Sequence, residues 1–489
     1  MNENSSIRVN SALLAIGITL AIWFVIPVPE GVTPQAWHLL ALFIGTIAAI
    51  IGKAMPIGAL AMIAIALVAI TGVTNNKPSA AVADALSGFS NPLIWLIGIS
   101  IMISRGLIKT GLGPRIGYTF IRLFGKKTLG IGYALGLSEL VLAPVTPSNT
   151  ARGGGIMHPI MRSIAESFDS SPDKGTSNKI GRYLALVNYH SNPITSAMFI
   201  TATAPNPLVV KFVAEATGAQ ISLSWSTWAL AMLLPGLVAM ALMPLVLYWL
   251  SPPEIKDTPA ASQFARDRIA ELGPVKGKEK ILLGVFALML LLWAGVPTML
   301  LGQGYAVDAT AAAALGLSLL LVTSVLDWDD VLKEKGAWDT ITWFAALVMM
   351  ATFLNKLGLI TWFSKSIETG ILGLGLGWVG AVALLTLVYM YAHYLFASTT
   401  AHITAMFGAF FAAGIALGAP PMAFALLLAA VSSIMMTLTH YATGTSPIIF
   451  GSGYVSLGEW WKVGFVMSLV NLATWVVVGG LWWQALGYW

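Results

Sequence analysis

Apolar stretches about twenty residues long follow one another along almost the whole chain, separated by short polar connections. A helix needs about 20 mostly apolar residues to cross a bilayer, because each residue adds only about 1.5 Å to its length. Only 10% of the residues are charged, whereas about 25% is usual in soluble domains. The chain is therefore predicted to be an all-α polytopic membrane protein. The candidate segments are 11–28, 37–52, 55–73, 91–108, 129–162, 183–213, 226–250, 280–302, 308–326, 340–357, 376–416, 420–452 and 462–487.

Two of these segments are too long for a single crossing, and a polar sequence interrupts each of them. Residues 129–162 contain TPSNTARGGG, and residues 376–416 contain FASTTAH. Backbone that leaves the helix at membrane depth is tolerated only where protein buries it or where it lines a watery cavity. Each segment is therefore predicted to be a re-entrant helical hairpin whose tip carries the polar sequence. About eleven transmembrane helices remain once the two hairpins are set aside.

Lys and Arg are concentrated in alternate connections, which predicts the orientation of the chain because short loops rich in these residues stay in the cytoplasm. With the N-terminus inside, the outside connections contain only Lys77, Lys211, Lys356 and Lys365. We therefore expect a cytoplasmic N-terminus and an outside C-terminus, in a bacterial inner membrane. The +5 net charge is spread between the spans, so it gives no reason to expect a nucleic-acid partner.

Two segments between the spans have their own character. Residues 113–127 mix basic and apolar residues and are predicted to form a helix at the inner membrane surface. Residues 251–280 form the longest polar run. This run is predicted to be a cytoplasmic loop that joins two halves of the chain, 1–250 and 281–489.

The two halves contain similar short sequences in the same order, and the first pair aligns Trp95 with Trp343. An odd number of spans between matching points inverts the second half, and inverted repeats are typical of secondary transporters. Chance similarity between apolar, glycine-rich sequences is the alternative explanation. The matched pairs are GFSNPLIWLIG (88–98) with GAWDTITWFAA (336–346), LIKTGL (107–112) with LNKLGL (354–359), SNTAR (148–152) with STTAH (398–402), and TATAPNPLVV (201–210) with YATGTSPIIF (441–450).

Each hairpin tip, and each later sequence TATAPNP or TGTSP, is predicted to interrupt a helix near the middle of the bilayer. Helix N-termini and hydroxyl groups bind anions, and the two repeats would present two such clusters to one central point. The predicted ligand therefore has two anionic ends, as a dicarboxylate has. For any single Ser or Thr, the alternative is that it only satisfies a backbone carbonyl of its own helix. The predicted substrate-binding residues are Ser148, Asn149, Thr150, Thr203, Pro205, Asn206, Ser398, Thr399, Thr400, Thr443, Thr445, Ser446 and Pro447.

Arg152 and His402 occupy matching positions, two residues after Thr150 and Thr400. Ionisable residues at membrane depth are costly and usually mark a transport path. The alternatives are a snorkelling side chain for Arg152 and a neutral, hydrogen-bonded ring for His402. Glu139 is the only acidic residue well inside an apolar segment, and it is the candidate partner of Arg152. No metal or cofactor is expected, because a cation site is hard to build from one carboxylate.

The sequences LAPVTPSNTARGGG, HYLFASTTAH and HYATGTSPIIFGSGY resemble the divalent anion:sodium symporter family. The resemblance covers essentially the whole chain and is closest to the exchanger branch. That branch includes bacterial citrate/succinate and tartrate/succinate antiporters and the plastid 2-oxoglutarate/malate translocator. The resemblance implies a homodimer in the lipid bilayer, in which each protomer has a scaffold domain and a transport domain that moves as an elevator. In sodium-coupled members both tips read Ser-Asn-Thr, and each frames one sodium ion.

This chain departs from that pattern at the second tip, where Thr399 replaces the asparagine. The resemblance therefore implies a sodium-independent antiporter of C4–C5 dicarboxylates such as 2-oxoglutarate, malate and succinate. Arg152 and His402 are expected to compensate charge in place of sodium. A sodium-coupled di/tricarboxylate symporter and an anion channel are the alternatives. An enzyme that acts on lipids is not expected, because the sequence has no His-Glu zinc motif or Gly-x-Ser-x-Gly sequence.

Overall fold

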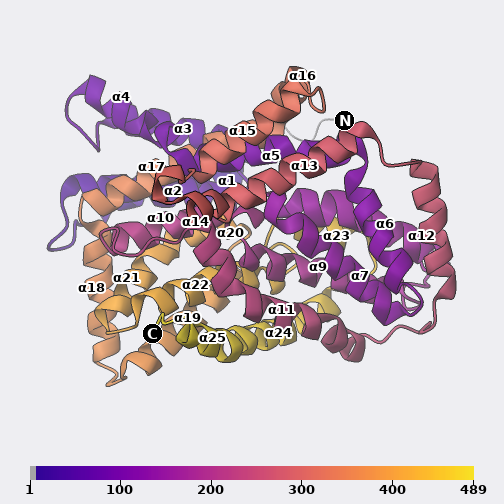
Figure 1. Ribbon diagram of the computed structural model, residues 1–489. Helices are drawn as coiled ribbons and strands as arrows, with labels where there is room; N and C mark the ends of the chain where they lie inside the picture. Colours follow the sequence, from indigo (N-terminus) through magenta and orange to yellow (C-terminus); the bar gives the residue numbers. More distant parts are fainter. Residues whose placement is uncertain (1–6) are drawn as a thin grey trace.

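The computed structural model describes residues 7–489, and every regular element among them is helical (Figure 1). Within that range, eight helices are long and apolar enough to cross a membrane by length and composition, and four shorter apolar helices accompany them. The predicted all-α polytopic class is therefore confirmed. The number of about eleven transmembrane helices stays a prediction, because several of these helices are arms of hairpins or halves of interrupted spans.

The helices form two groups that lie one above the other in Figure 1. The upper group, which we call the frame, contains the helices that precede the hairpin in each half. Within the frame, α17 packs against α2, α3 and α5, and α13 packs against α15. The frame consists of α1 (Val9–Leu20), α2 (Pro34–Ile51), α3 (Ile57–Thr71), α4 (Pro78–Leu86), α5 (Pro92–Thr110), α13 (Gly277–Trp293), α14 (Val296–Leu301), α15 (Ala309–Val322), α16 (Trp328–Lys333) and α17 (Lys335–Lys356).

The lower group contains the predicted hairpins and the helices that follow them, and we call it the hairpin group. Near its centre, α9 contacts α7, α8, α11 and α22. The hairpin group consists of α7 (Thr128–Leu142), α8 (His158–Ser167), α9 (Gly181–Met198), α10 (Asn206–Ala216), α11 (Trp225–Leu250), α19 (Trp378–Tyr391), α20 (Thr399–His402), α21 (Gly408–Ala416), α22 (Pro421–Ile434), α23 (Thr445–Gly451), α24 (Leu457–Thr474) and α25 (Gly480–Ala485).

A similar corner connects the frame to the hairpin group in both halves. The last frame helices, α5 and α17, are followed by α6 (Leu112–Phe124) and α18 (Leu359–Leu372). Gly111 and Gly358 lie at these corners, each with a φ of 82°. Glycine adopts this left-handed conformation without a steric penalty because it has no Cβ atom. These are the glycines that the match between LIKTGL and LNKLGL aligns, so the aligned sequences form the same turn.

The polar run 251–280 is partly helical, which corrects the expectation of a loop. It contains α12 (Pro259–Leu272), and Pro259 occupies the first turn, where its missing N–H has no cost. Ala261 and Ala265 are buried, and α12 packs against α6. Two small apolar residues four apart give the helix a face for packing. The strongly polar composition around them conceals that face in the sequence.

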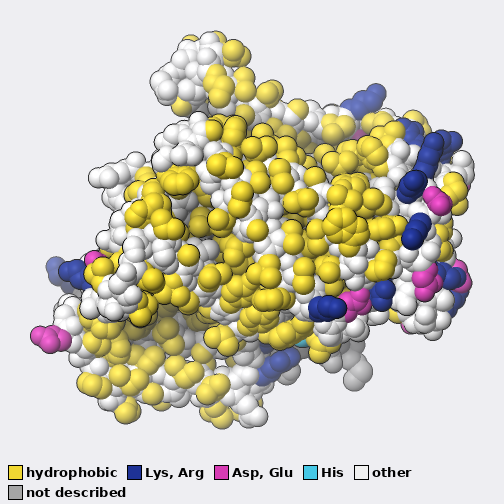
Figure 2. All heavy atoms as spheres, turned by 90° about the horizontal axis from the view of Figure 1, so that it is seen from below, with side chains coloured by type: hydrophobic (Ala, Val, Ile, Leu, Met, Phe, Trp, Pro, Cys, Tyr) yellow, Lys and Arg dark blue, Asp and Glu magenta, His cyan; other side chains and the backbone are white. Residues whose placement is uncertain are grey.

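The visible surface matches what a membrane protein requires. The face in Figure 2 is largely hydrophobic, and most of its Lys and Arg side chains gather toward the right-hand end. In Figure 1 the helices α6 and α12 lie at that end. There, Arg115 of α6 forms an ion pair with Glu279 of α13, with Nε and Oε2 2.6 Å apart. The predicted helix at 113–127 is thus present as α6 and is tied to the frame.

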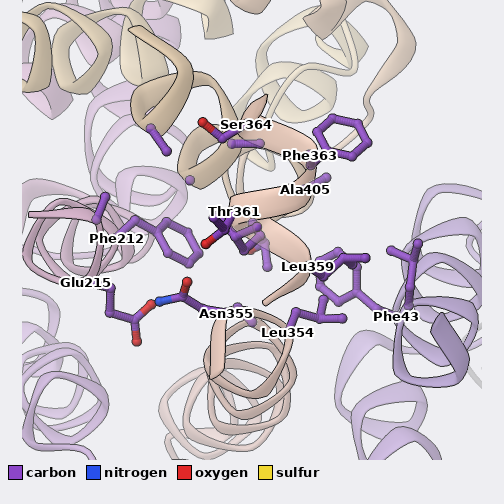
Figure 3. Close-up of a pocket in the computed structure, with 18 of the residues that line it drawn as sticks. Phe43, Phe212, Glu215, Leu354, Asn355, Leu359, Thr361, Phe363, Ser364 and Ala405 are labelled. Atoms are coloured by element: carbon purple, nitrogen blue, oxygen red, sulfur yellow. The ribbon is translucent and has the colours of Figure 1, made fainter. Parts of the chain in front are cut away.

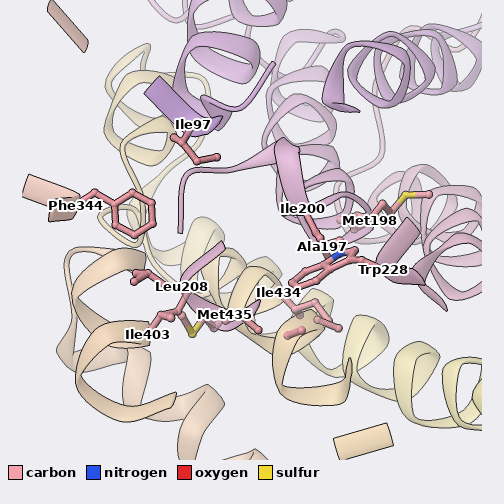
Figure 4. Close-up of a cluster of buried hydrophobic side chains, with 14 of the residues drawn as sticks. Ile97, Ala197, Met198, Ile200, Leu208, Trp228, Phe344, Ile403, Ile434 and Met435 are labelled. Atoms are coloured by element: carbon pink, nitrogen blue, oxygen red, sulfur yellow. The ribbon is translucent and has the colours of Figure 1, made fainter. Parts of the chain in front are cut away.

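Buried apolar side chains join the frame to the hairpin group. In Figure 4, Ile97 of α5 and Phe344 of α17 lie on one side of a cluster that includes Leu208 of α10. Trp228 of α11 belongs to the same cluster and donates its indole N–H to the carbonyl oxygen of Ala197 at 2.8 Å. This cluster makes part of the contact between the two groups apolar, and the contact also contains Lys211 of α10, which donates to the carbonyl oxygen of Val348 in α17 at 3.2 Å and to the hydroxyl of Thr352.

We expect Gly88→Ala to destabilise the frame. Gly88 lies where the turn Ser87–Ser90 packs against α17, and a Cβ atom there would lie 2.1 Å from the backbone oxygen of Ala345. Overpacking of this kind typically costs about 1–3 kcal/mol. Gly284→Ala is the matched control, because no other part of the described chain lies within 4 Å of a Cβ atom at that helical position. Thermal unfolding in detergent measures both variants, and equal melting temperatures would contradict this packing.

Candidate functional site

The first hairpin tip is a helix start that Ser148 caps. After α7 and the turn Ala143–Val145, the chain resumes as the π-helix η4 (Thr150–Met157). The Ser148 hydroxyl accepts a hydrogen bond from the backbone N–H of Ala151 at 3.1 Å. A hydroxyl that accepts in this way still has its own hydrogen to donate. The tip therefore presents a donor at the N-terminus of a helix.

The second hairpin tip repeats this geometry. Ser398 caps α20, and its hydroxyl accepts a hydrogen bond from the backbone N–H of Ala401 at 3.3 Å. From Thr399 the helical backbone continues to Ala416, so its N-terminus has the partial positive charge of a long helix. Both tips thus begin a helix with a serine N-cap, as the match between SNTAR and STTAH predicts.

Two interruptions complete the site, one between α9 and α10 and one between α22 and α23. Thr203 in the first interruption has an extended backbone, with a φ of −152° and a ψ of 145°. Asn149 donates its side-chain N–H to the hydroxyl of Thr443 at 3.0 Å. The hydroxyl of Thr399 donates to the carbonyl oxygen of Ala442 at 3.2 Å. Both hairpin tips therefore meet at the interruption of the second half.

The tips and the interruptions line a cavity of about 220 Å³ between the hairpin group and the frame. No side chain among its lining residues is charged. Pockets for drug-sized ligands usually begin at about 300 Å³, so this cavity suits a smaller molecule. The lining residues are Ile101, Pro147, Ser148, Asn149, Thr150, Thr203, Ala204, Pro205, Thr340, Trp343, Ala397, Ser398, Thr399, Thr400, Thr443 and Gly444.

Most of the predicted substrate-binding residues are among the lining residues, but those after Pro205 and after Thr443 are not. The side-chain N–H of Asn206 donates to the carbonyl oxygen of Ser196 at 2.8 Å. The hydroxyl of Ser446 lies 2.7 Å from that of Tyr189. These polar groups hydrogen-bond to other parts of the protein and so stabilise the interruptions. The predicted residues that lie outside the cavity are Asn206, Thr445, Ser446 and Pro447.

Sequence reasoning missed the residues that the frame contributes. Ile101 of α5 and both Thr340 and Trp343 of α17 line the cavity. Thr340 is only 8% exposed and Trp343 only 7%. The one sequence feature that singles out Trp343 is its alignment with Trp95, and that alignment indicates an internal repeat and not a binding site. Nothing in the local sequence indicates that α17 packs beside the hairpin tips.

Arg152 is fully buried in the hairpin group and does not line the cavity. Its Nε donates to the carboxylate of Glu139 at 2.7 Å, which confirms the predicted pairing. Its Nη1 donates to the backbone oxygen of Thr146 at 2.6 Å and to that of Ala202 at 2.8 Å. The planar guanidinium can satisfy several acceptors at once. It therefore holds the first hairpin tip against the interruption between α9 and α10.

His402 occupies the matching place in the second hairpin and is also buried. Its Nδ1 lies 3.0 Å from Nδ1 of His393, whose Nε2 lies 3.0 Å from the carbonyl oxygen of Ala442. A hydrogen bond between two imidazole nitrogens requires one ring to donate and the other to accept. Ala442 and Ala202 are aligned in the two repeats. The two halves therefore hold the same carbonyl, one with a guanidinium and the other with an imidazole.

The pairing with Glu139 limits the charge that Arg152 can supply in place of sodium. Because Glu139 lies 2.7 Å from its Nε, the charge is balanced inside the hairpin group. An unpaired charge at this depth would be costly, and the pair avoids that cost. Neither Arg152 nor His402 lines the cavity, so any influence on a ligand there acts through the surrounding backbone.

A larger cavity of about 520 Å³ lies away from the hairpin tips, among α2, α10, α17, α18 and α21. In Figure 3, Phe43, Phe212 and Leu354 surround it, and Glu215 and Asn355 lie toward one side. It contains none of the predicted substrate-binding residues. The smaller polar cavity is therefore the candidate site for a charged metabolite.

Removing one member of the buried ion pair should destabilise the protein more than removing both. Arg152→Met leaves Glu139 buried without its partner, which typically costs about 3–5 kcal/mol. Adding Glu139→Gln removes the remaining charge, so we expect the double variant to regain part of the lost stability. Arg162→Met is the control, because Arg162 and Glu166 form an exposed pair worth about 0.5 kcal/mol at most. A double variant no more heat-stable than Arg152→Met would contradict this account.

Residues 7–489 match the family described as "Sodium:sulfate symporter transmembrane region". The putative malate transporter YflS of Bacillus subtilis is 48% identical to this chain, over 100% of this chain and 98% of its own length. The chloroplastic dicarboxylate transporter 1 of Spinacia oleracea is 44% identical, over 100% of this chain and 83% of its own length. The L-tartrate/succinate antiporter of Shigella sonnei is 36% identical, over 95% of this chain and 96% of its own length.

Solved structures of transporters have a similar fold. Neisseria gonorrhoeae MtrF has a TM-score of 0.58 and 14% identity, over 96% of this chain and 97% of its own. The Alcanivorax borkumensis YdaH transporter has a TM-score of 0.57 and 13% identity, over 92% of this chain and 99% of its own. At such identities the likeness concerns the fold alone. The family match and the relatives show that the chain is a multi-pass membrane transporter, not an enzyme, and that it belongs to the sodium:sulfate symporter family, the divalent anion:sodium symporters.

Proposed function

We propose that this transporter exchanges C4–C5 dicarboxylates of the 2-oxoglutarate, malate and succinate type without sodium. One observation carries the proposal: two serine-capped helix starts, one from each hairpin, line the same small neutral cavity. Relatives named as malate transporter, dicarboxylate transporter and tartrate/succinate antiporter support the substrate class and the exchange.

In this proposal each hairpin tip holds one carboxylate. Backbone N–H groups and hydroxyls at each tip donate to the carboxylate oxygens, and each helix N-terminus adds about half a positive charge. Thr203, Pro205 and Thr443 form the walls between the tips. The first carboxylate is held by Ser148, Asn149 and Thr150. The second is held by Ser398, Thr400 and the backbone N–H of Thr399, whose hydroxyl already donates to the carbonyl oxygen of Ala442.

The neutral cavity favours exchange over the return of an empty site. Asn149 and Thr399 already donate to protein oxygens, but without an anion the hydroxyls of Ser148 and Ser398 have only water as an acceptor in the cavity. Water is a weaker acceptor than a carboxylate, because hydrogen bonds to an ionised group are roughly twice as strong as those between neutral groups. A bound dicarboxylate satisfies both tips together. The proposal requires that the hairpin group cross more readily when it is loaded, which is the behaviour of an exchanger.

Protein donors already occupy carbonyl oxygens around the site, and a carbonyl oxygen is the kind of ligand that a sodium ion would need. Arg152 donates to Thr146 and Ala202, and the imidazole of His393 lies against the carbonyl oxygen of Ala442. An N–H group and a cation compete for the same oxygen lone pairs. In this proposal Arg152, together with Glu139, and His402, acting through His393, take the place of sodium.

The cavity lies where the two helix groups meet, since α5 and α17 of the frame line it together with the hairpin group. Movement of the hairpin group against the frame would carry the cavity from one side of the membrane to the other. This supports the elevator mechanism that the family resemblance implies. We assign the frame to the scaffold domain and the hairpin group to the transport domain, with 1–250 and 281–489 as inverted repeats.

We place the protein as a homodimer in a bacterial inner membrane, with its N-terminus in the cytoplasm and its C-terminus outside. The basic residues near α6 and α12 support a cytoplasmic location for that end. The C-terminus lies toward the opposite end in Figure 1. A sodium-coupled di/tricarboxylate symporter is the second candidate, and the name of the matched family favours it. An anion channel is the third, since anion-binding tips can also line a pore.

Alanine substitution at either tip should weaken substrate binding. Removal of one charge-assisted hydrogen bond typically costs about 1.5–3 kcal/mol, so we expect Asn149→Ala and Thr400→Ala to lower the affinity for succinate by about 10- to 100-fold. Thr386→Val is the control, because its hydroxyl has no hydrogen-bond partner among residues 7–489 and lies outside the cavity. Competition assays on the purified protein measure the affinities. Wild-type affinity in both tip variants would refute the assignment of the carboxylate sites.

Reconstituted liposomes distinguish the three mechanisms. We expect uptake of labelled succinate only into vesicles loaded with a dicarboxylate, at the same rate with sodium or with potassium outside. Fast sodium-driven uptake into empty vesicles would instead identify a symporter. Uptake into empty vesicles that follows the membrane potential without sodium would identify a channel.

A further inference from the structure

Two polar side chains of the frame line the cavity, on the side that faces the hairpin group. Thr340 and Trp343 both belong to α17, and the other polar lining residues belong to the hairpin group. Both side chains are more than nine-tenths buried, at 8% and 7% exposure. Neither has a part in holding the carboxylates in the proposed function. Their place in the cavity wall therefore calls for a separate explanation.

The polar groups of these two residues have no partner among residues 7–489. The indole N–H of Trp343 and the hydroxyl of Thr340 make no hydrogen bond there, and neither atom is fully buried. The aligned tryptophan of the first half, Trp95, donates its indole N–H to the carbonyl oxygen of Phe89 at 2.7 Å. The more deeply buried Trp228 also donates to a carbonyl. A buried indole N–H normally finds an acceptor, so the acceptor of Trp343 is expected in the cavity.

We propose that Thr340 and Trp343 select dicarboxylates that carry a hydroxyl or keto oxygen on the carbon next to a carboxylate. The indole N–H donates to that oxygen. The hydroxyl of Thr340 accepts from a substrate hydroxyl or donates to a substrate keto group. This proposal rests on the proposed function, because it assumes that the two tips hold the two carboxylates. It adds the chemical group that distinguishes one dicarboxylate from another.

The chemistry of the two groups favours oxygen substituents over a plain carbon chain. Succinate has only methylene groups between its carboxylates, so it leaves both polar groups of α17 to water. Malate places a hydroxyl there, and 2-oxoglutarate places a keto oxygen. A neutral hydrogen bond typically changes affinity by about 3- to 10-fold. We therefore expect a moderate preference for substituted dicarboxylates rather than an absolute one.

The test compares malate with succinate in variants that keep the shape of the cavity wall. Trp343→Phe removes the N–H, and Thr340→Val removes the hydroxyl. Each variant is reconstituted in liposomes loaded with succinate, and unlabelled malate or succinate competes with labelled succinate outside. We expect malate to compete about 3- to 10-fold less well in each variant, while competition by succinate is unchanged. Thr340→Ser keeps the hydroxyl and should retain the wild-type preference.

Trp95→Phe is the matched control, because Trp95 holds a carbonyl of its own segment and does not line the cavity. It should leave the ratio of malate to succinate affinity unchanged. Exchange of succinate itself shows that each variant is folded. If Trp343→Phe does not fold, Thr340→Val alone tests the proposal. An equal loss for malate and succinate, or no change for either, would overturn the selection proposal. A wild-type protein that exchanges neither compound would instead overturn the proposed function.

Discussion

The buried ion pair between Arg152 and Glu139 is the interaction on which the rest of the site depends. One guanidinium joins the first arm of the hairpin, its tip and the interruption between α9 and α10. A charge at membrane depth is tolerated only when it is paired and hydrogen-bonded, so these elements are held in one arrangement. Asn192 extends the network, because its side chain donates to Glu139 and to the carbonyl oxygen of Asn149, a residue of the cavity wall.

The second half reaches the same geometry with different chemistry. The carbonyl oxygen of Ala442 is held by Thr399 and His393, whereas that of Ala202 is held by a guanidinium. The repeat therefore preserves the positions of the carbonyls beside the cavity and not the residues that hold them. The match between the two tips does not extend to His393, since the corresponding residue of the first half is Ala143.

Features that follow from local chemistry could be predicted, and features that depend on distant packing could not. Ser148 follows a proline and begins a helix, so its capping role is readable from the sequence. A lone carboxylate and a lone guanidinium at membrane depth require each other, and Glu139 and Arg152 are indeed paired. Ser446, like the tip residues, is a hydroxyl residue in a polar interruption of a helix. Its hydroxyl is hydrogen-bonded to that of a buried tyrosine, so it does not line the cavity. Trp343 reaches the cavity only because α17 packs beside the tips, and this packing cannot be predicted from the sequence around Trp343.

The two helix groups would contribute to transport in different ways. In an elevator the tips travel with the substrate, whereas a contact with α17 exists only while the cavity lies beside the frame and must break before the substrate crosses. A strong contact there would stabilise the bound state without stabilising the crossing, and would slow transport. Neutral partners such as an indole N–H and a hydroxyl contribute only about 0.5–1.5 kcal/mol each. Such contacts are strong enough to distinguish substrates, and they are weak enough to break when the substrate moves away from the frame. A contact with a charged side chain on the frame would be harder to break.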